Sequence, residues 1–370
     1  MAALKDNVDA QMVDALADEL AAAWPDLPRG EFVAQATAGL DGLELKGRIR
    51  QVAVALRAAL PDEVTEVVAV LDAALRSPSF SGWMVWPVAE LAGDLGPDHP
   101  ELVLPFMARL THRSSCEFAI RPCLEQHPEL TFRHLTAWVA DPDEHVRRLV
   151  SEGTRPRLPW GTRLRTLQQD PSPSIALLDR LRDDPSEYVR RSVANHLGDV
   201  VKDHPDLALA TARRWRAEGG DHVASVIRHG LRTLIKAGDP AALELIGYAA
   251  DAPVHLERVS IAPDRLAIGG RAWLEVELTT DGPAPVPVVV EYLVHYLGAR
   301  GPRKPKAYRL AERVLEPGVT CRLRRTQRFD HASIRTLYPG EHVIEVQVNG
   351  RVLGSCRLRL EETEVASAKR

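Results

Sequence analysis

The sequence predicts a mainly α-helical protein, in which a solenoid of stacked helix pairs is followed by a small antiparallel β-sandwich. Three observations predict this fold: the helical spacing of apolar residues through the first 250 residues, an internal repeat, and a change to short strand-like segments near residue 253. A chain of 370 residues has room for two or three domains. We therefore assign residues 1–252 to the solenoid and residues 253–363 to the sandwich.

Apolar residues recur every three or four positions along the first 250 residues, as on the buried face of a helix. Turns rich in proline and glycine separate these segments, and no strand-like alternation of any length precedes residue 253. The spacing predicts helices through three early apolar sets: Val8, Met12, Leu16 and Leu20; Phe32, Ala36 and Leu40; Val52, Leu56 and Leu60.

The internal repeat decides the type of helical fold. Residues 141–150, DPDEHVRRLV, return as residues 184–193, DPSEYVRRSV, at an offset of 43 residues. We expect each initial aspartate to cap a helix that begins at the following proline. A His-Pro-acid-Leu sequence at residues 99–102, 127–130 and 204–207 predicts helix junctions with structural histidines. A period of about 40–47 residues is typical of HEAT repeats, which present a concave surface built from one helix of each pair.

Short strand-like segments, separated by turn residues, follow residue 253. Asn349-Gly350 is a two-residue hairpin signal. Six or seven short strands predict an immunoglobulin-like sandwich, and residues 337–342 resemble the corner between its sheets. Cys321 and Cys356 could form an inter-sheet disulfide, although we expect a reduced, buried pair in a cytoplasmic chain. The expected strands are residues 254–259, 272–278, 288–296, 320–329, 342–348 and 352–360.

Composition and charge exclude several classes of protein. Hydrophobic residues make up 45% of the chain and charged residues 26%, which excludes a disordered tail or a collagen-like fibre. No window approaches the ~18 consecutive apolar residues of a spanning helix, and the N-terminus does not resemble a signal peptide, so we expect a cytoplasmic protein. The net charge of −4 divides into −9 for residues 1–100, +1 for residues 101–250 and +4 for residues 251–370. Any surface that binds a polyanion is therefore local and lies in the last two-thirds of the chain.

The sequence lacks the common cofactor motifs. It contains no P-loop, dinucleotide fingerprint, H-E-x-x-H or C-x-x-C motif. Cys116 and Cys123 are seven residues apart, which is a poor spacing for zinc. We therefore expect no metal, nucleotide or other cofactor. Trp83 and Trp86, at helical spacing, are interpreted as core residues.

One segment concentrates chemical groups: residues 147–161, RRLVSEGTRPRLPWG. We expect Gly153 to end a helix just after Glu152, with Arg148 one turn earlier on the same face. A proline-stiffened loop then carries Arg155, Arg157 and Trp160. Two interpretations remain open. The first is a surface salt-bridge cluster with a tryptophan that closes the core. The second is an anion-binding cleft, in which arginines hold two phosphates while a carboxylate and an aromatic face favour a positive charge between them.

Three segments resemble the AlkC group of HEAT-like-repeat DNA glycosylases, which belongs to the DNA alkylation repair family related to AlkD. They are residues 147–161, 186–206 (SEYVRRSVANHLGDVVKDHPD) and 226–243 (VIRHGLRTLIKAGDPAAL), and the resemblance covers about residues 30–250. A C-terminal immunoglobulin-like domain occurs in part of the AlkC group, and residues 291–340 are similar to it. The resemblance implies a monofunctional, monomeric glycosylase of base excision repair. It would excise cationic 3-methyladenine and 3-methylcytosine from double-stranded DNA without full base flipping.

The resemblance also implies roles for individual residues. Glu152 would be the catalytic carboxylate, Glu117 a second acid near the lesion, and Trp160 part of the lesion site. AlkD-type enzymes have an aspartate at the catalytic position, and the longer arm of Glu152 changes the geometry. DNA-binding roles would fall to Arg148, Arg155, Arg157, Arg191, Asn195, His196, Arg228 and His229, with polar packing between helices as the alternative for the last four.

A basic loop in the β-domain is a further candidate. Its cations are Arg300, Arg303, Lys304 and Lys306. The loop is either a solvated turn or, beside a DNA-binding solenoid, a contact to phosphates or the minor groove, and we predict the second.

The chemistry fits these residues. Alkylation at N3 makes the base cationic and a good leaving group, and a carboxylate can stabilise the oxocarbenium-like sugar that remains. Two other classes of function stay open: a HEAT-repeat protein scaffold, and a protein that binds damaged DNA without catalysis.

Overall fold

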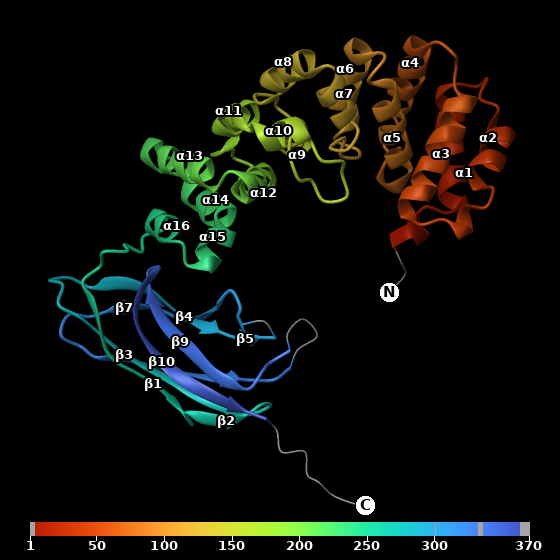
Figure 1. Cartoon of the computed structure of the whole chain (residues 1–370). Coiled ribbons are helices and arrows are strands. Elements are labelled where there is room, and N and C mark those ends of the chain that lie inside the picture. Colours follow the sequence, from red (N-terminus) through yellow and green to blue (C-terminus); the bar gives the residue numbers. More distant parts are fainter. Residues whose placement is uncertain (1–3, 300, 332–335, 363–370) are drawn as a thin grey trace, which may run out of the picture. The chain divides into compact units, whose positions relative to one another are not determined.

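The computed structural model describes residues 4–299, 301–331 and 336–362 (Figure 1). The chain forms two compact units. The first extends to Pro205 and includes Gly219–Gly230, whereas the second contains Asp206–Glu218 and the chain from Leu231 onward.

The first unit is built from helices, as the apolar spacing predicts. Asp9 caps the first of them, because its side chain accepts a hydrogen bond from the Met12 backbone N–H at 2.8 Å. The residues expected on its buried face, from Val8 to Leu20, are indeed buried. The helices are α1 (Ala10–Ala23), α2 (Arg29–Thr37), α3 (Leu45–Ala59), α4 (Val64–Ala74), α5 (Val85–Leu95), α6 (Pro100–Leu110), α7 (Arg121–Gln126), α8 (Pro128–Trp138), α9 (Glu144–Gly153), α10 (Arg165–Gln169), α11 (Ser172–Leu181), α12 (Glu187–Asp203) and α14 (Val223–Gly230).

These helices stack in succession, which confirms the predicted solenoid. Helices α1, α4, α6 and α8 contact one another in that order, and so do α3, α5 and α7. Further along the chain, α9 packs on α12 and α12 packs on α14 (Figure 1). Because each helix of a repeat protein packs on its neighbours, residues from distant parts of the sequence meet along one row.

The two repeat helices begin later than the sequence predicts. We expected Asp141 and Asp184 to be N-caps, but α9 is capped by Asp143 and α12 begins after Ser186. Each aspartate instead accepts a hydrogen bond from the backbone N–H two residues on, at 2.8 Å for Asp141 and 2.9 Å for Asp184. This local bond makes the Asp-Pro sequence a turn that precedes the helix.

The expected structural role of two junction histidines agrees with their contacts. The His127 Nε2 lies 2.6 Å from the Pro97 carbonyl oxygen, and the His204 Nε2 lies 2.8 Å from that of Gln168. The His127 ring thus links the start of α8 to the loop before α6, and the His204 ring links the end of α12 to α10. No helix in the described part of the chain is long and apolar enough to cross a lipid bilayer.

The second unit contains the predicted β-sandwich. One sheet has the strand order β1-β3-β8, the other has the order β2-β10-β9-β4-β7, and β5 pairs with β6. The strands are β1 (Val254–Ala262), β2 (Arg265–Ala267), β3 (Arg271–Thr280), β4 (Val286–His295), β5 (Leu297–Gly298), β6 (Gly301–Pro302), β7 (Lys306–Leu315), β8 (Cys321–Arg328), β9 (Gly340–Val348) and β10 (Arg351–Glu361).

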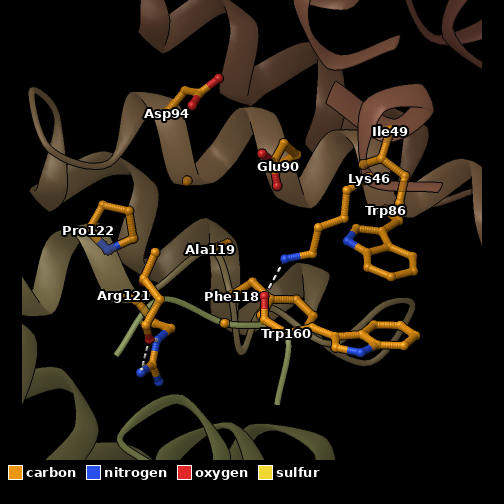
Figure 2. Close-up of a pocket in the computed structure, with 13 residues that line it drawn as sticks. Lys46, Ile49, Trp86, Glu90, Asp94, Phe118, Ala119, Arg121, Pro122 and Trp160 are labelled. Atoms are coloured by element: carbon orange, nitrogen blue, oxygen red, sulfur yellow. Dashed lines mark hydrogen bonds between the residues drawn. The ribbon is translucent and has the colours of Figure 1, made fainter. Parts of the chain in front are cut away.

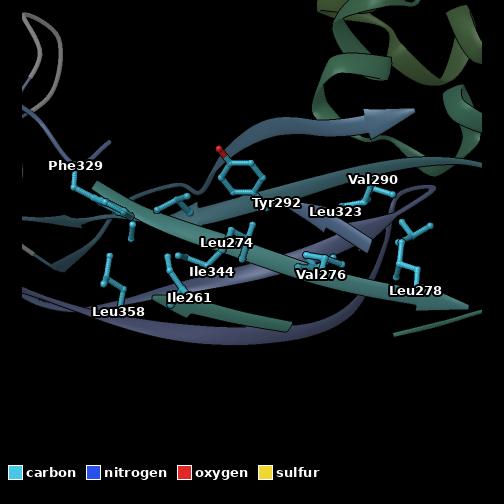
Figure 3. Packing of buried hydrophobic residues seen from close by; sticks show 14 of the residues in the cluster. Ile261, Leu274, Val276, Leu278, Val290, Tyr292, Leu323, Phe329, Ile344 and Leu358 are labelled. Carbon is cyan, nitrogen blue, oxygen red and sulfur yellow. The ribbon is translucent and has the colours of Figure 1, made fainter. Parts of the chain in front are cut away.

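Alternating side chains of these strands form the sandwich core. In β3, Leu274, Val276 and Leu278 point inward, and they meet Val290 and Ile344 of the other sheet (Figure 3). This alternation made most strands predictable. Strand β7 was missed because its residues are mostly half-buried or exposed at a sheet edge, and the short β2 pairs in parallel with β10, so the sandwich is not purely antiparallel.

The second unit also includes helices α13 (Pro205–Glu218), α15 (Arg232–Ala237) and α16 (Pro240–Leu245). The Gln347 amide donates to the Gly238 carbonyl at 3.2 Å, and the Asn349 amide donates to the Ala249 carbonyl at 2.8 Å. The first strand begins at Val254, where the sequence changes from helical apolar spacing to strand-like segments. The domain boundary at residue 252 stays a prediction.

All four cysteines are unbridged. Cys321 and Cys356, which were expected to be buried, are half-buried and lie in different sheets.

Candidate active site

Helix α9 places Arg148 and Glu152 one turn apart near its C-terminal end. The helix ends at Gly153, as predicted, but not through a left-handed cap, because Gly153 lacks a positive φ. The glycine is needed for space instead: a Cβ atom there would lie 2.7 Å from the Cγ2 atom of Ile120. The end of α9 therefore packs tightly against the segment that precedes α7.

The Glu152 carboxylate is buried and doubly hydrogen-bonded. Its Oε1 accepts from the Arg155 Nη1 at 2.6 Å, and its Oε2 accepts from the Ser192 hydroxyl of α12 at 2.5 Å. The Arg148 Nη2 lies 3.8 Å from the same Oε2. Only 5% of Glu152 is exposed, so these contacts replace the water that a carboxylate normally requires.

The two arginines extend this site into a buried charge network of Glu117, Arg148, Glu152, Arg155 and Asp199. The Arg148 Nη1 donates to Glu117 at 2.8 Å, and the Arg155 Nε donates to Asp199 at 2.8 Å. Burial opposes the charged form of both arginines, but the neighbouring carboxylates outweigh it and raise the pKa of each. The network brings together three of the residues that the sequence singled out in α9 and its loop, together with Glu117.

Aromatic and ionic contacts surround the network. The Arg148 guanidinium lies 4.6 Å from the centroid of the Tyr188 ring. The sequence did not single out Tyr188 or Asp199. Ion pairs also link the α9 repeat to the α12 repeat: Arg147 binds Asp184 at 2.7 and 3.0 Å, and Arg157 binds Asp203 at 2.7 and 2.6 Å.

Arg121 is a central residue that the sequence analysis missed. It is 1% exposed and donates only to backbone carbonyls: to Thr162 through Nε at 2.8 Å, and through Nη1 to Gly153 at 3.0 Å and Arg155 at 2.9 Å. Its Nη2 also donates to Thr162. Burial lowers the pKa of Arg121 to about 10, which leaves it charged at neutral pH. One cation therefore fastens both ends of the loop that carries Arg155 and Trp160. The only signal in the sequence was an arginine within the apolar run CEFAIRPCL.

Trp160 is held in an unusual backbone conformation. Its φ of 65° lies in the left-handed region, which is rare for a bulky residue, and 61% of it is exposed. The Lys46 ammonium of α3 donates a hydrogen bond to the Trp160 carbonyl and lies 5.7 Å from the centroid of the Phe118 ring. Trp160 thus does not close the core, as one interpretation of the loop required.

This chain is similar to known proteins over nearly its whole length. Residues 255–362 match the family described as "Uncharacterised protein YhaZ, C-terminal Ig-like domain". The uncharacterised protein YhaZ of Bacillus subtilis (strain 168) is 35% identical over 358 residues, which are 96% of this chain and 98% of YhaZ. The structure is similar to the alkylpurine DNA glycosylase AlkC of Pseudomonas fluorescens, solved bound to DNA containing an abasic site analogue. The TM-score is 0.82 and the identity 36%, over 97% of this chain and 99% of AlkC. The chain belongs to the AlkC family.

The DNA-binding residues expected from the AlkC resemblance differ in how accessible they are. Arg191, Arg228 and His229 are exposed, and the His229 Nε2 lies 3.0 Å from the Asn195 Oδ1, which links α12 and α14. His196 is completely buried and its Nδ1 lies 2.9 Å from the Ser151 carbonyl oxygen, so the expected DNA contact is replaced by the packing role. Arg148, Arg155 and Arg157 bind carboxylates here, and their binding to phosphate stays a prediction.

The basic loop expected to aid the AlkC-type site lies between β6 and β7. Arg303, Lys304 and Lys306 are exposed, and the Lys306 ammonium lies 5.2 Å from the centroid of the Tyr308 ring. Arg300 lies outside the described residues. Among the residues that the structure describes, no group of three or more His, Cys, Asp or Glu side chains is arranged to hold a metal ion.

Proposed function

We propose that this protein is a monomeric DNA glycosylase that excises alkylated, cationic bases from double-stranded DNA without a cofactor. The observation that carries the proposal is the buried Glu152 carboxylate, held between Arg155 and Ser192, in a chain similar over 97% of its length to an alkylpurine DNA glycosylase. The DNA in that AlkC structure supports duplex DNA as the partner.

The proposed reaction uses the charge of the lesion. The bond between C1′ and the alkylated base breaks, and its electron pair moves onto the base, which leaves as a neutral molecule. The sugar becomes oxocarbenium-like, a water molecule adds to C1′, and the proton of that water passes to a carboxylate or to solvent. Because an alkylated base leaves readily, stabilisation of the sugar cation by a fixed carboxylate is the main requirement.

Glu152 and Glu117 are the carboxylates that we assign to this step. They lie on opposite sides of Arg148, which contacts Glu117 at 2.8 Å and Glu152 at 3.8 Å. The Glu152 side chain is fixed by three polar partners, whereas the Glu117 side chain is 15% exposed and accepts from Ser115 and Arg148. We assign stabilisation of the sugar cation to Glu152 and contact with the lesion to Glu117, with 3-methyladenine and 3-methylcytosine as substrates.

Accessibility suggests how the substrate is held. Trp160 exposes its ring at the surface of the helical unit, and we propose that it contacts the lesion there, without rotation of the base out of the duplex. The exposed cations Arg303, Lys304 and Lys306 would add phosphate contacts from the second unit.

Single-turnover release of free base from methylated duplex DNA, measured by chromatography, tests the function. We expect Glu152→Gln to lower the rate by ~10²-fold or more, with little change in affinity for DNA. Glu101→Gln, on the exposed first turn of α6, is the matched control. A wild-type protein that binds methylated duplex but leaves it intact would indicate a non-catalytic damage binder, and one without salt-dependent DNA affinity would indicate a protein scaffold.

A further inference from the structure

A pocket lies within the first unit (Figure 2). Helices α3 and α5, the segment from Phe118 to Pro122, and the loop from Trp160 to Thr162 form its walls. The cavity measures about 230 Å³. Pockets for drug-sized ligands span roughly 300–1,000 Å³, so this one suits a single ring system rather than a whole nucleotide.

The walls of this pocket offer flat aromatic surfaces. The Trp86 and Phe118 rings are stacked with centroids 6.1 Å apart and planes inclined by 10°, and the Trp83 ring stacks on that of Trp86 with centroids 5.7 Å apart. Trp86 and Phe118 line the pocket, and Trp160 adds a third aromatic side chain to the lining (Figure 2). The sequence interpretation of Trp83 and Trp86 as core residues is corrected here, because both are half-buried and Trp86 lines an open cavity. Planar heteroaromatic rings bind to such surfaces by stacking.

The cations that line the pocket are already engaged. Arg121 directs its donors to backbone carbonyls, and Lys46 donates to the Trp160 carbonyl. Neighbouring Arg50 donates to Asp94. Two carboxylates, Glu90 and Asp94, line the pocket together with Lys46 and Arg121, and this balance of charge argues against a phosphate as its ligand.

Glu90 is a carboxylate of the pocket that has unused capacity to accept hydrogen bonds. None of the described residues donates a hydrogen bond to it, and its nearest ion-pair contact, with the Arg50 Nη1, is 3.7 Å long. Its carboxyl group points into the space above Phe118 and Ala119 (Figure 2). Burial, and then the charge of Asp94, raise the pKa of Glu90, which strengthens the demand for a donor or a positive charge next to it. An exocyclic amino group on an electron-poor ring would meet this demand.

We propose that this pocket binds the free alkylated base after excision, with its ring against Trp160 and Phe118 and its exocyclic amine donating to Glu90. The inference rests on the proposed function, since excision supplies this ligand. The location supports it: Phe118 directly follows Glu117 of the charge network, and Trp160 ends the loop that begins at Arg155. The pocket and the charge network therefore share two chain segments.

Titration of the full-length protein with free 3-methyladenine, in the absence of DNA, tests the proposal. Tryptophan fluorescence or calorimetry should show saturable binding to one site. We expect 3-methylhypoxanthine, which has a carbonyl in place of the amine, to bind about tenfold more weakly. Glu90→Gln should weaken binding of 3-methyladenine by about fivefold, because a neutral acceptor replaces a charged one. Trp160→Ala should weaken it by about tenfold or more through lost stacking.

Glu66→Gln, at an exposed position of α4 outside the pocket, is the matched control and should bind 3-methyladenine like the wild type. Absence of saturable binding by the wild type, equal affinity for the two bases, or wild-type affinity of Glu90→Gln would each overturn the proposal. Base release measured on the same preparations separates the two inferences. Excision without binding of the free base refutes the pocket assignment alone. Base binding without excision refutes the proposed function and, with it, the role of the pocket as a product site.

Discussion

Arg121→Met is the substitution whose effect can be worked out most fully from the structure. The change removes the donors of three carbonyls, those of Gly153, Arg155 and Thr162. A buried acceptor without a partner costs about 1–3 kcal/mol, so the buried carbonyls of Gly153 and Arg155 together cost about 4 kcal/mol, and the lost hydrogen bonds to the exposed residue Thr162 add about 1 kcal/mol. Burial of the cation costs about 3 kcal/mol, since it lowers the pKa of Arg121 to about 10 and each tenfold change in proton affinity corresponds to about 1.4 kcal/mol. Methionine does not carry that cost, so the net expected loss of stability is about 2 kcal/mol.

Thermal and urea unfolding of the full-length protein measure this loss. For a unit of this size, about 2 kcal/mol corresponds to a Tm lower by roughly 4–8 °C. At temperatures where the variant is still folded, single-turnover excision should fall more than tenfold, because the loop between Glu152 and Trp160 loses its fastening. Arg109→Met is the control: Arg109 makes a two-pronged ion pair with Asp72 at an exposed site, where such pairs contribute about 0–1 kcal/mol. If Arg121→Met were no less stable than Arg109→Met, the assigned role of Arg121 would be refuted.

Three further predictions can be tested separately. Lys46→Met should release the Trp160 carbonyl and weaken binding of 3-methyladenine in the fluorescence titration, whereas unchanged binding would show that the loop holds Trp160 without Lys46. His196 has its pKa lowered to about 4 by burial, so the unfolded chain binds the proton first. Stability present above pH ~6.5 should therefore be lost as the pH falls toward 4, by at most about 3 kcal/mol, and a His196→Asn variant that kept this slope in urea titrations would contradict the assignment. Replacing Arg303, Lys304 and Lys306 together by Ala should weaken DNA binding and reduce the slope of log affinity against log salt by about three, and an identical slope would make the loop a solvated turn.

The sequence predicted the features that depend on local patterns. Apolar spacing identified the helices, the 43-residue repeat identified the solenoid, and alternation identified most strands. It also placed Glu152 at the end of a helix with Arg148 one turn away, because both lie within ten residues. Family resemblance, rather than pattern, supplied Glu117, since its pairing with Arg148 spans 31 residues.

The features that the sequence did not predict depend on contacts between distant segments. Arg121 is recognisable only by carbonyls 32 to 41 residues away, and the burial of His196 follows from the packing of α12 on α9. Trp86 has the helical spacing of a core residue, and only its position beside Phe118 and a cavity shows otherwise. The N-caps of α9 and α12 were predicted two residues too early. An aspartate can accept a hydrogen bond from the backbone in a turn just ahead of a helix as easily as it can at the helix N-cap.

The ion pairs between the α9 and α12 repeats have a mechanical consequence. In a repeat protein the stability of each junction between neighbours is a separate quantity, and the chain can open at one junction while the others stay closed. Three arginine–aspartate pairs, from Arg147 to Asp184, Arg155 to Asp199 and Arg157 to Asp203, span this one junction. The Glu152 carboxylate of α9 also spans this junction, since it accepts a hydrogen bond from the Ser192 hydroxyl of α12. Loosening of the solenoid at this junction would therefore change the partners of Glu152 before any repeat unfolds.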